Sequence, residues 1–187
     1  MPFLELSHYQ MDSVDIEQSI LPCNFSAGAL LPVHSELKEW QRSPPEGFAL
    51  EEASGQDMTQ WCISMQGPEC LGGPGMSKDF YLGKVFRVRV RFNEQYPIQA
   101  PEVVFLDPTP VHPHIYSNGH ICLDVLYDGQ SGGWSPALTI SKIVLSLQSM
   151  LASNSSPTRP PGDMDYCQRV GTRSPKLTRW VFEDDKV

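Results

Sequence analysis

The chain has 187 residues, of which 40% are hydrophobic and 19% charged, and its formal net charge is −8. This length and composition predict one soluble globular domain with an irregular extension. The acidic balance argues against a general affinity for nucleic acids or anionic lipids, because both need clustered lysine and arginine. We therefore expect protein partners, and neither nucleic acid nor membrane among them.

The cysteines and the N-terminal residues bear on the cellular compartment in which the protein is expected. The cysteines are odd in number, widely scattered and without a C-x-x-C pair, so the sequence favours neither a disulfide framework nor a four-thiolate zinc site. No segment approaches the roughly 20 apolar residues of a membrane span, and no basic stretch leads into an apolar run. We expect the cytoplasm, the nucleus or both. The cysteines are Cys23, Cys62, Cys70, Cys122 and Cys167.

The N-terminal part of the chain contains an irregular segment and a short helix. Residues 1–31 mix acidic, apolar and small residues without a sustained period, and we interpret them as a disordered N-terminal extension. A helix is predicted over 32–41, since apolar residues recur at i, i+4 and i+7 and Pro32 suits a first helical position. The prolines at 44 and 45 end it.

Alternation of apolar and polar residues predicts two half-buried strands, over 58–65 and 86–92. The second strand carries an arginine at every other position. These arginines invite a nucleic-acid interpretation, but the overall acidity favours the solvated outer face of an antiparallel sheet. A proline-bracketed corner at 96–101 and a short apolar strand at 103–106 follow.

The clearest helical pattern follows Thr139, which can cap a helix whose wide apolar stripe reaches Leu151 and would pack across the sheet. Residues 153–162 are rich in serine and proline and end this helix. From residue 163 the chain has a basic stretch, two aromatic residues and an acidic end. This composition leaves two alternatives open, a mobile arm and a loosely docked helix.

Residues 111–126 read V-H-P-H-I-Y-S-N-G-H-I-C-L-D-V-L and place Cys122 just behind a turn signal, at the border between apolar core and open loop. His112, His114, His120 and Cys122 supply donors that a metal could use. However, Pro113 places a histidine on either side of a rigid bend, and no other acid or cysteine completes a recognisable ligand spacing. We therefore expect a reactive thiol without a metal, and keep a small metal-binding protein as an alternative.

Three runs in this region resemble the active-site sequence of ubiquitin-conjugating enzymes. They are His112-Pro113-His114, Asn118-Gly119-His120-Ile121-Cys122-Leu123 and Trp134-Ser135-Pro136-Ala137-Leu138-Thr139. His114 stands where the family usually has asparagine, and this variation and the S-P-K-L-T-R-W-V-F-E-D-D run near the end are similar to the W-type branch. The resemblance implies an α+β ubiquitin-conjugating fold, a four-stranded antiparallel meander with helices packed on it. The core would span 32–155, followed by a variable C-terminal segment, 156–187.

The resemblance also implies the chemistry. Cys122 would take the C-terminus of ubiquitin from the activating enzyme as a thioester, which an amine then attacks. No cofactor is expected, because the activating enzyme uses the ATP and this chain has no phosphate-binding loop. His114 either donates a hydrogen bond to the tetrahedral oxyanion or supports the loop. His112, Pro113 and Asn118 would fix the loop.

Partners follow from the same resemblance. Ile98, Trp134, Pro136 and Ala137 would form the patch that docks RING or U-box ubiquitin ligases. The first helix lacks the basic residues with which relatives contact the activating enzyme at its start, which leaves that contact open. A rival interpretation is a non-catalytic variant that acts as a binding module, against which Cys122 itself argues.

The acceptor is expected to be an N-terminal α-amino group. The loop after the long helix reads S-N-S-S-P-T-R-P-P and carries no acid before Asp163. In relatives, an acid there helps to deprotonate lysine. The substrate would therefore be a protein with a flexible N-terminus, as the W-type resemblance also implies.

Overall fold

The computed structural model describes residues 30–51, 58–69, 80–129 and 132–182. The predicted N-terminal extension therefore lies almost entirely outside the described residues, as do Cys23 and Cys70. Helix α1 (Leu31–Arg42) begins one residue before the predicted start, so Leu31 belongs to the helix. Among the described residues, no helix is long and apolar enough to span a membrane.

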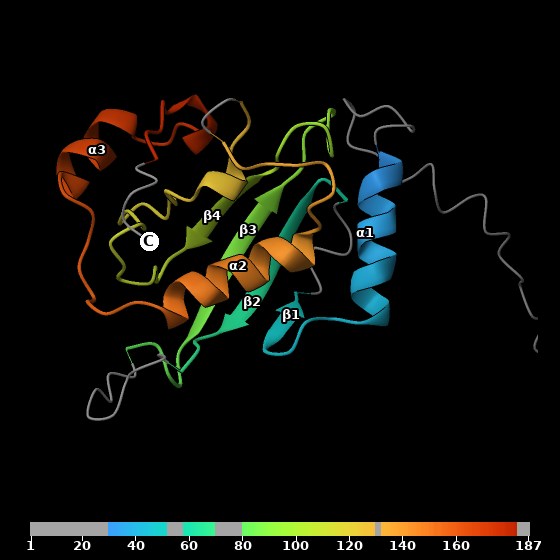
Figure 1. Ribbon diagram of the computed structural model, residues 1–187, viewed down its shortest axis with the longest axis horizontal. Coiled ribbons are helices and arrows are strands. Elements are labelled where there is room, and N and C mark those ends of the chain that lie inside the picture. The colour runs from blue at the N-terminus through green and yellow to red at the C-terminus, as the bar shows by residue number, and fades with distance from the viewer. Residues whose placement is uncertain (1–29, 52–57, 70–79, 130–131, 183–187) are drawn as a thin grey trace, which may run out of the picture.

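Four strands form one antiparallel sheet in the order β1-β2-β3-β4 (Figure 1). They are β1 (Phe48–Leu50), β2 (Gln60–Gln66), β3 (Val85–Arg91) and β4 (Glu102–Leu106). Each strand pairs with its neighbour in the chain, which makes the sheet a meander. The predicted α+β class and the strands at 58–65, 86–92 and 103–106 are confirmed. β1 has three residues and no period of its own, so it was expected only from the resemblance.

Helix α2 (Ile140–Ala152) lies across one face of the sheet (Figure 1). As predicted, Thr139 caps the helix, and its hydroxyl accepts a hydrogen bond of 3.3 Å from the Lys142 N–H. Its apolar stripe and the inward side chains of β2 and β3 exclude water almost completely. Each such side chain contributes roughly 1.5–3 kcal/mol relative to an exposed one, so this contact contributes strongly to stability. The helical members are Ile140, Ile143, Val144, Leu147 and Leu151.

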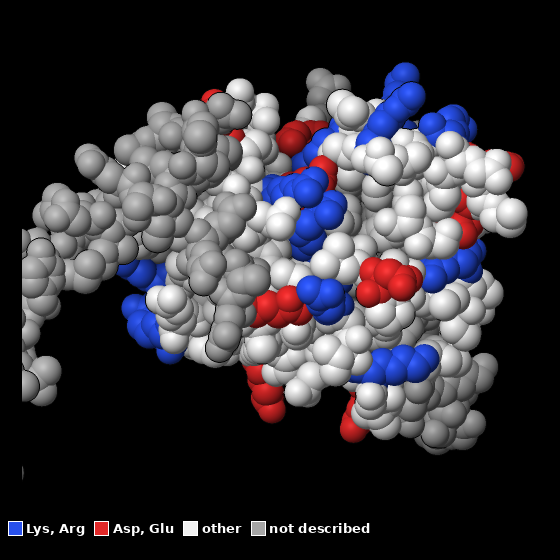
Figure 2. Space-filling view, turned by 180° about the vertical axis from the view of Figure 1, so that it is seen from behind, with Lys and Arg blue, Asp and Glu red and all other residues white. Residues whose placement is uncertain are grey.

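The outer face of the sheet carries the alternate arginines together with acidic partners. Arg87 binds Glu51 through two hydrogen bonds of 2.7 and 2.9 Å, and Arg89 and Arg91 lie 3.4 and 3.7 Å from Glu102. Figure 2 shows basic and acidic side chains interspersed on the face seen from behind. The predicted solvated outer face is confirmed, and its charges are paired with one another.

The C-terminal part of the chain is docked. Helix α3 (Asp163–Val170) is followed by a 3-10 turn, η4 (Pro175–Leu177), and both lie beyond β4 (Figure 1). Tyr166 is 5% exposed, and its ring lies 4.0 Å from that of Tyr116, between centroids. Of the two alternatives left by the sequence, the described residues form a docked helix and not a mobile arm.

Candidate active site

The loop that carries Cys122 is fastened to β4 through Gly119. The Gly119 carbonyl accepts a hydrogen bond of 2.9 Å from the Phe105 N–H. Gly119 has a φ of +87°, and a Cβ atom there would lie 2.0 Å from the Phe105 carbonyl oxygen. Only glycine combines this backbone conformation with so close an approach. The turn before Cys122 therefore has a fixed position relative to the sheet.

Cys122 is half-buried, and the backbone on both of its sides is held. Its N–H donates to the His114 carbonyl at 2.8 Å, and the Tyr127 hydroxyl donates to the Ile121 carbonyl at 2.6 Å. Burial raises the pKa of the Cys122 thiol. The thiol is therefore protonated at neutral pH.

The hydrogen bonds of His112 define its tautomer. Its Nδ1 lies 3.0 Å from the His114 N–H and must accept, so its Nε2 carries the proton and donates to the Met150 carbonyl at 3.1 Å. Burial, with a smaller contribution from nearby His114, lowers the pKa of His112 to about 4, against the hydrogen bond to Met150, which acts to raise it. A neutral His112 thus joins the active-site loop to the end of α2. These contacts fit the loop-fixing role, which stays a prediction.

The other predicted loop residues lie around the same turn. The Asn118 side-chain oxygen accepts a hydrogen bond of 3.1 Å from the His120 N–H, which closes the turn. Pro113 is half-buried, whereas His114 is exposed and its ring tilts against that of His112 at 5.5 Å between centroids. The structure thus joins His112, His114 and Cys122 through backbone contacts. The catalytic or supporting role of His114 stays a prediction.

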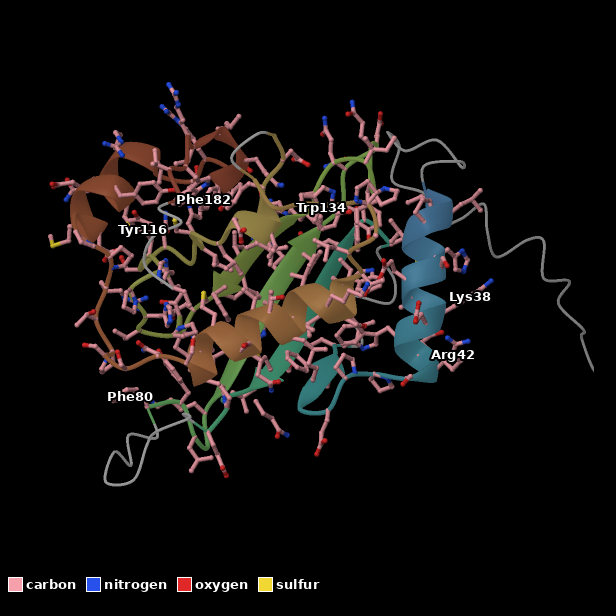
Figure 3. All side chains as sticks on the ribbon, in the orientation of Figure 1. Lys38, Arg42, Phe80, Tyr116, Trp134 and Phe182 are labelled. Carbon is pink, nitrogen blue, oxygen red and sulfur yellow. The ribbon has the colours of Figure 1, made fainter. Side chains whose placement is uncertain are left out.

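The C-terminal segment holds the same loop from another side, which sequence reasoning missed. The Asp163 carboxylate accepts a hydrogen bond of 2.8 Å from the Ser117 N–H, and the Tyr166 hydroxyl lies 2.8 Å from His120 Nδ1. Partial burial acts to raise the pKa of Asp163, but the hydrogen bonds from Ser117 and Cys167 outweigh it and the pKa is lowered. Figure 3 shows Tyr116 and Phe182 on this side of the molecule. No sequence signal marks pairs 46 residues apart.

The predicted ligase patch lies on two segments that the structure brings together. Ile98 is 75% exposed, and Pro136 and Ala137 are also exposed. Trp134 is half-buried, and its indole N–H donates to the Pro97 carbonyl at 2.9 Å (Figure 3). Trp134 therefore links the corner at 96–101 to the segment that carries Pro136.

The histidines and the cysteine that the metal-binding alternative would use form no ligand set among the described residues. In the part of the chain that the structure describes, no three His, Cys, Asp or Glu side chains are grouped so that they could hold an ion. Both ring nitrogens of His112 lie within hydrogen-bonding distance of backbone groups. The ring nitrogens of His112 thus hold the loop in place through hydrogen bonds.

Comparisons with known proteins agree with the geometry. The family model of ubiquitin-conjugating enzymes matches residues 32–179. Ubiquitin-conjugating enzyme 15 of Arabidopsis thaliana is 44% identical over 156 residues, which cover 83% of this chain and 88% of the relative. Ubiquitin-conjugating enzyme E2 W of Caenorhabditis elegans is 40% identical over 154 residues, or 81% of this chain and 93% of the relative.

A solved structure shows the same fold. The ubiquitin-conjugating enzyme UbcA1 of Agrocybe aegerita has a TM-score of 0.66 and 35% identity, over 81% of this chain and 100% of that one. Enzymes of this kind are transferases that act through a cysteine thioester. The chain therefore belongs to the ubiquitin-conjugating enzyme family, within which it is similar to the W type.

Proposed function

We propose that Cys122 carries ubiquitin as a thioester and passes it to the N-terminal α-amino group of a substrate protein. The observation that carries the proposal is a half-buried thiol on a backbone that is held on both sides. A fixed backbone keeps the sulfur in one place while a large partner docks, which lowers the entropy cost of the reaction.

The transfer proceeds in two balanced steps. The Cys122 sulfur attacks the thioester carbonyl on the activating enzyme, a new carbon–sulfur bond forms, and the thiol proton passes to the departing thiolate through solvent. An amine then attacks the new thioester, and the tetrahedral intermediate collapses with Cys122 leaving as a thiolate and the amine losing a proton. His114, exposed beside the loop, supplies an N–H for the oxyanion.

Acid–base chemistry supports an α-amine as the acceptor. At pH 7.2 the free-base fraction is about 0.2 for an α-amine with a pKa near 7.8, against about 0.0006 for lysine near 10.4, a roughly 300-fold difference. The lower basicity of the α-amine reduces its nucleophilicity, and a sensitivity similar to that of thiols leaves at least a tenfold advantage. Asp163, the first acid after α2, accepts hydrogen bonds from Ser117 and Cys167. Its carboxylate thus serves the loop instead of an incoming lysine.

Three partners complete the proposal: ubiquitin, the activating enzyme and a RING or U-box ligase. The ligase would dock on Ile98, Pro136 and Ala137, apart from the thiol. The activating enzyme would contact α1, where Lys38 and Arg42 project away from the sheet (Figure 3). They lie in the later turns of the helix and would replace the basic residues absent from its start. The proposed location is the cytoplasm, the nucleus or both.

A charging assay tests the nucleophile. The protein is incubated with activating enzyme, ATP and ubiquitin and separated on a non-reducing gel. We expect an adduct that reductant removes, no adduct for Cys122→Ala, and for Cys122→Ser an oxyester that resists reductant if it forms. Cys62→Ala is the matched control and should charge normally, because Cys62 lies in β2, outside the active-site loop. Charging of Cys122→Ala would overturn the assignment.

A second assay tests the acceptor. Charged protein is mixed with two versions of one disordered peptide, one with a free N-terminus and no lysine, the other acetylated and bearing lysines. We expect discharge at least tenfold faster onto the free N-terminus. Equal rates would refute the α-amine preference while leaving Cys122 as the nucleophile.

A further inference from the structure

The corner that carries Ile98 is held at both ends by the loop after the reactive cysteine. The Ala100 N–H, fully buried, donates to Asp128 Oδ1 at 2.7 Å. Trp134 donates its indole N–H to the Pro97 carbonyl at 2.9 Å and its backbone N–H to the Tyr127 carbonyl at 3.2 Å. The positions of residues 97 and 100 are therefore set by residues 128 and 134.

The other oxygen of Asp128 faces the C-terminal segment. Lys176, in η4, places its Nζ atom 3.5 Å from Asp128 Oδ2 and 2.8 Å from the Leu126 carbonyl, and 5.4 Å from the centre of the Tyr127 ring. One ammonium group thus contacts three consecutive residues through a carboxylate, a ring face and a carbonyl. The side chains of Lys176 and Asp128 are 23% and 41% exposed, so solvent screens this pair only in part.

We propose that Asp128 is a positioning residue that couples the ligase-docking corner to the C-terminal segment. One carboxylate oxygen accepts from the Ala100 amide and the other contacts Lys176. The carboxylate can therefore bind both partners only while the corner at 96–101 and the C-terminal segment are both in their observed positions. This inference rests on the proposed docking of a ligase at Ile98.

The coupling works in both directions. If the C-terminal segment undocks, the Asp128 carboxylate loses its contact with Lys176 and can rotate toward water. The hydrogen bond that it accepts from the Ala100 N–H is then formed less often. A ligase that prefers the ordered corner must then favour the docked C-terminal segment by the same factor, because linkage between two binding equilibria is reciprocal. The C-terminal segment also contacts the turn before Cys122 through Asp163. Asp128 therefore stands between the ligase patch and a segment that touches the reactive loop.

Amide hydrogen exchange of Ala100 in the full chain tests the coupling without a ligase. Lys176→Met keeps the length and apolar stem of the side chain and removes its charge. We expect Ala100 to exchange about twofold to fivefold faster in Lys176→Met, corresponding to the loss of a partly screened ion pair. The matched control is Lys84→Met, an exposed lysine outside the site, which should exchange as the unmutated protein does.

Two further measurements keep the test decisive. The Val88 amide, in the central strand β3, reports global unfolding and should stay unchanged in Lys176→Met. In Asp128→Asn the amide oxygen still accepts from Ala100 but the charge is gone, so adding Lys176→Met should have little additional effect. Unchanged Ala100 exchange in Lys176→Met, or full additivity of the two substitutions, would overturn the proposal.

The ligase assay then connects the coupling to function. Discharge of charged protein is measured against ligase concentration. We expect Lys176→Met to raise the concentration for half-maximal discharge while the maximal rate stays the same, because the ligase binds only the ordered corner. If the unmutated protein shows no ligase stimulation, the proposed docking at Ile98 fails, and the exchange result still decides the coupling. A lower maximal rate at unchanged half-maximal concentration would contradict the positioning role.

Discussion

The contact between α2 and the sheet differs in kind from the contact between the reactive loop and the C-terminal segment. The first consists of apolar side chains that exclude water almost completely, such as Leu147 and Ile63. The second consists of single hydrogen bonds and ring contacts, such as Ser117 with Asp163 and Tyr116 with Tyr166. Burial of apolar side chains stabilises the fold without requiring a particular orientation of the groups. Hydrogen bonds require a particular geometry and add little net free energy to stability. The fold and the site are therefore sensitive to different changes.

The largest effect is expected in the apolar contact. Leu147 is completely buried in the middle of α2, so Leu147→Ala loses transfer free energy and leaves a cavity. We expect a loss of about 2–5 kcal/mol in the free energy of unfolding, measured by urea titration. Charging of the folded fraction should persist at low temperature, because the loop contacts are unchanged. A loss below about 1 kcal/mol would place the main stability elsewhere.

Lowering the pH should weaken the contact that His112 makes between the active-site loop and α2. Because the pKa of His112 is about 4 in the folded protein, against an ordinary 6.5, the unfolded chain takes up a proton first as the pH falls. The stability from neutral His112 is complete above pH 6.5 and is lost as the pH falls toward 4, by up to about 3 kcal/mol. Urea titrations from pH 7 to pH 4 measure this loss.

The variant His112→Gln separates this effect from other titrations. Glutamine does not titrate, so the variant should be less stable at pH 7 and should lose less stability on acidification. Leu147→Ala is the control, since it destabilises the fold without removing a titrating group. Parallel curves for His112→Gln and the unmutated protein would contradict the role of His112.

A smaller and local effect is expected at the C-terminal segment. The Trp180 ring lies 5.8 Å from that of Tyr116 and 5.3 Å from that of Tyr127, between centroids. Aromatic pairs contribute about 0.5–1.5 kcal/mol each, so Trp180→Ala should make local opening about tenfold more frequent. Trypsin should then cut faster after Lys176, with little change in global stability. Val181→Ala, at an exposed neighbour, is the control and should be cut at the original rate.

The smallest effect on stability is expected at the ligase patch. Ile98 is 75% exposed, so Ile98→Ala should change the free energy of unfolding by less than about 0.5 kcal/mol. Charging of Cys122 should be unaffected, and ligase-stimulated discharge should fall about threefold to tenfold. Leu82→Ala is a matched control on another exposed apolar side chain. Equal loss of charging and of discharge in Ile98→Ala would indicate misfolding instead.

The same difference explains what could be predicted from the sequence. The helix over 32–41, the strand over 86–92 and the capped helix after Thr139 have periodic apolar residues, and all three are in the structure. Helix α3 buries only Tyr166, which leaves no stripe to recognise. The contacts of Asp128 and Asp163 join segments that are distant in the chain, and neither the residue type nor the spacing predicts these contacts. The reactive loop was recognised through its resemblance to a family, because a single cysteine has no periodicity.

Gly119 has a consequence at the level of the gene. Every missense change of a glycine codon by one base introduces a residue with a Cβ atom, and that atom would lie 2.0 Å from the Phe105 carbonyl oxygen. All single-base missense changes at this codon should therefore displace the turn, one residue before His120 and three residues before Cys122. Neighbouring Ser117 is exposed and should accept many of its own single-base replacements. In a saturation library scored for ubiquitin charging, substitutions at position 119 should lose most of the charging activity, whereas many substitutions at position 117 should keep it.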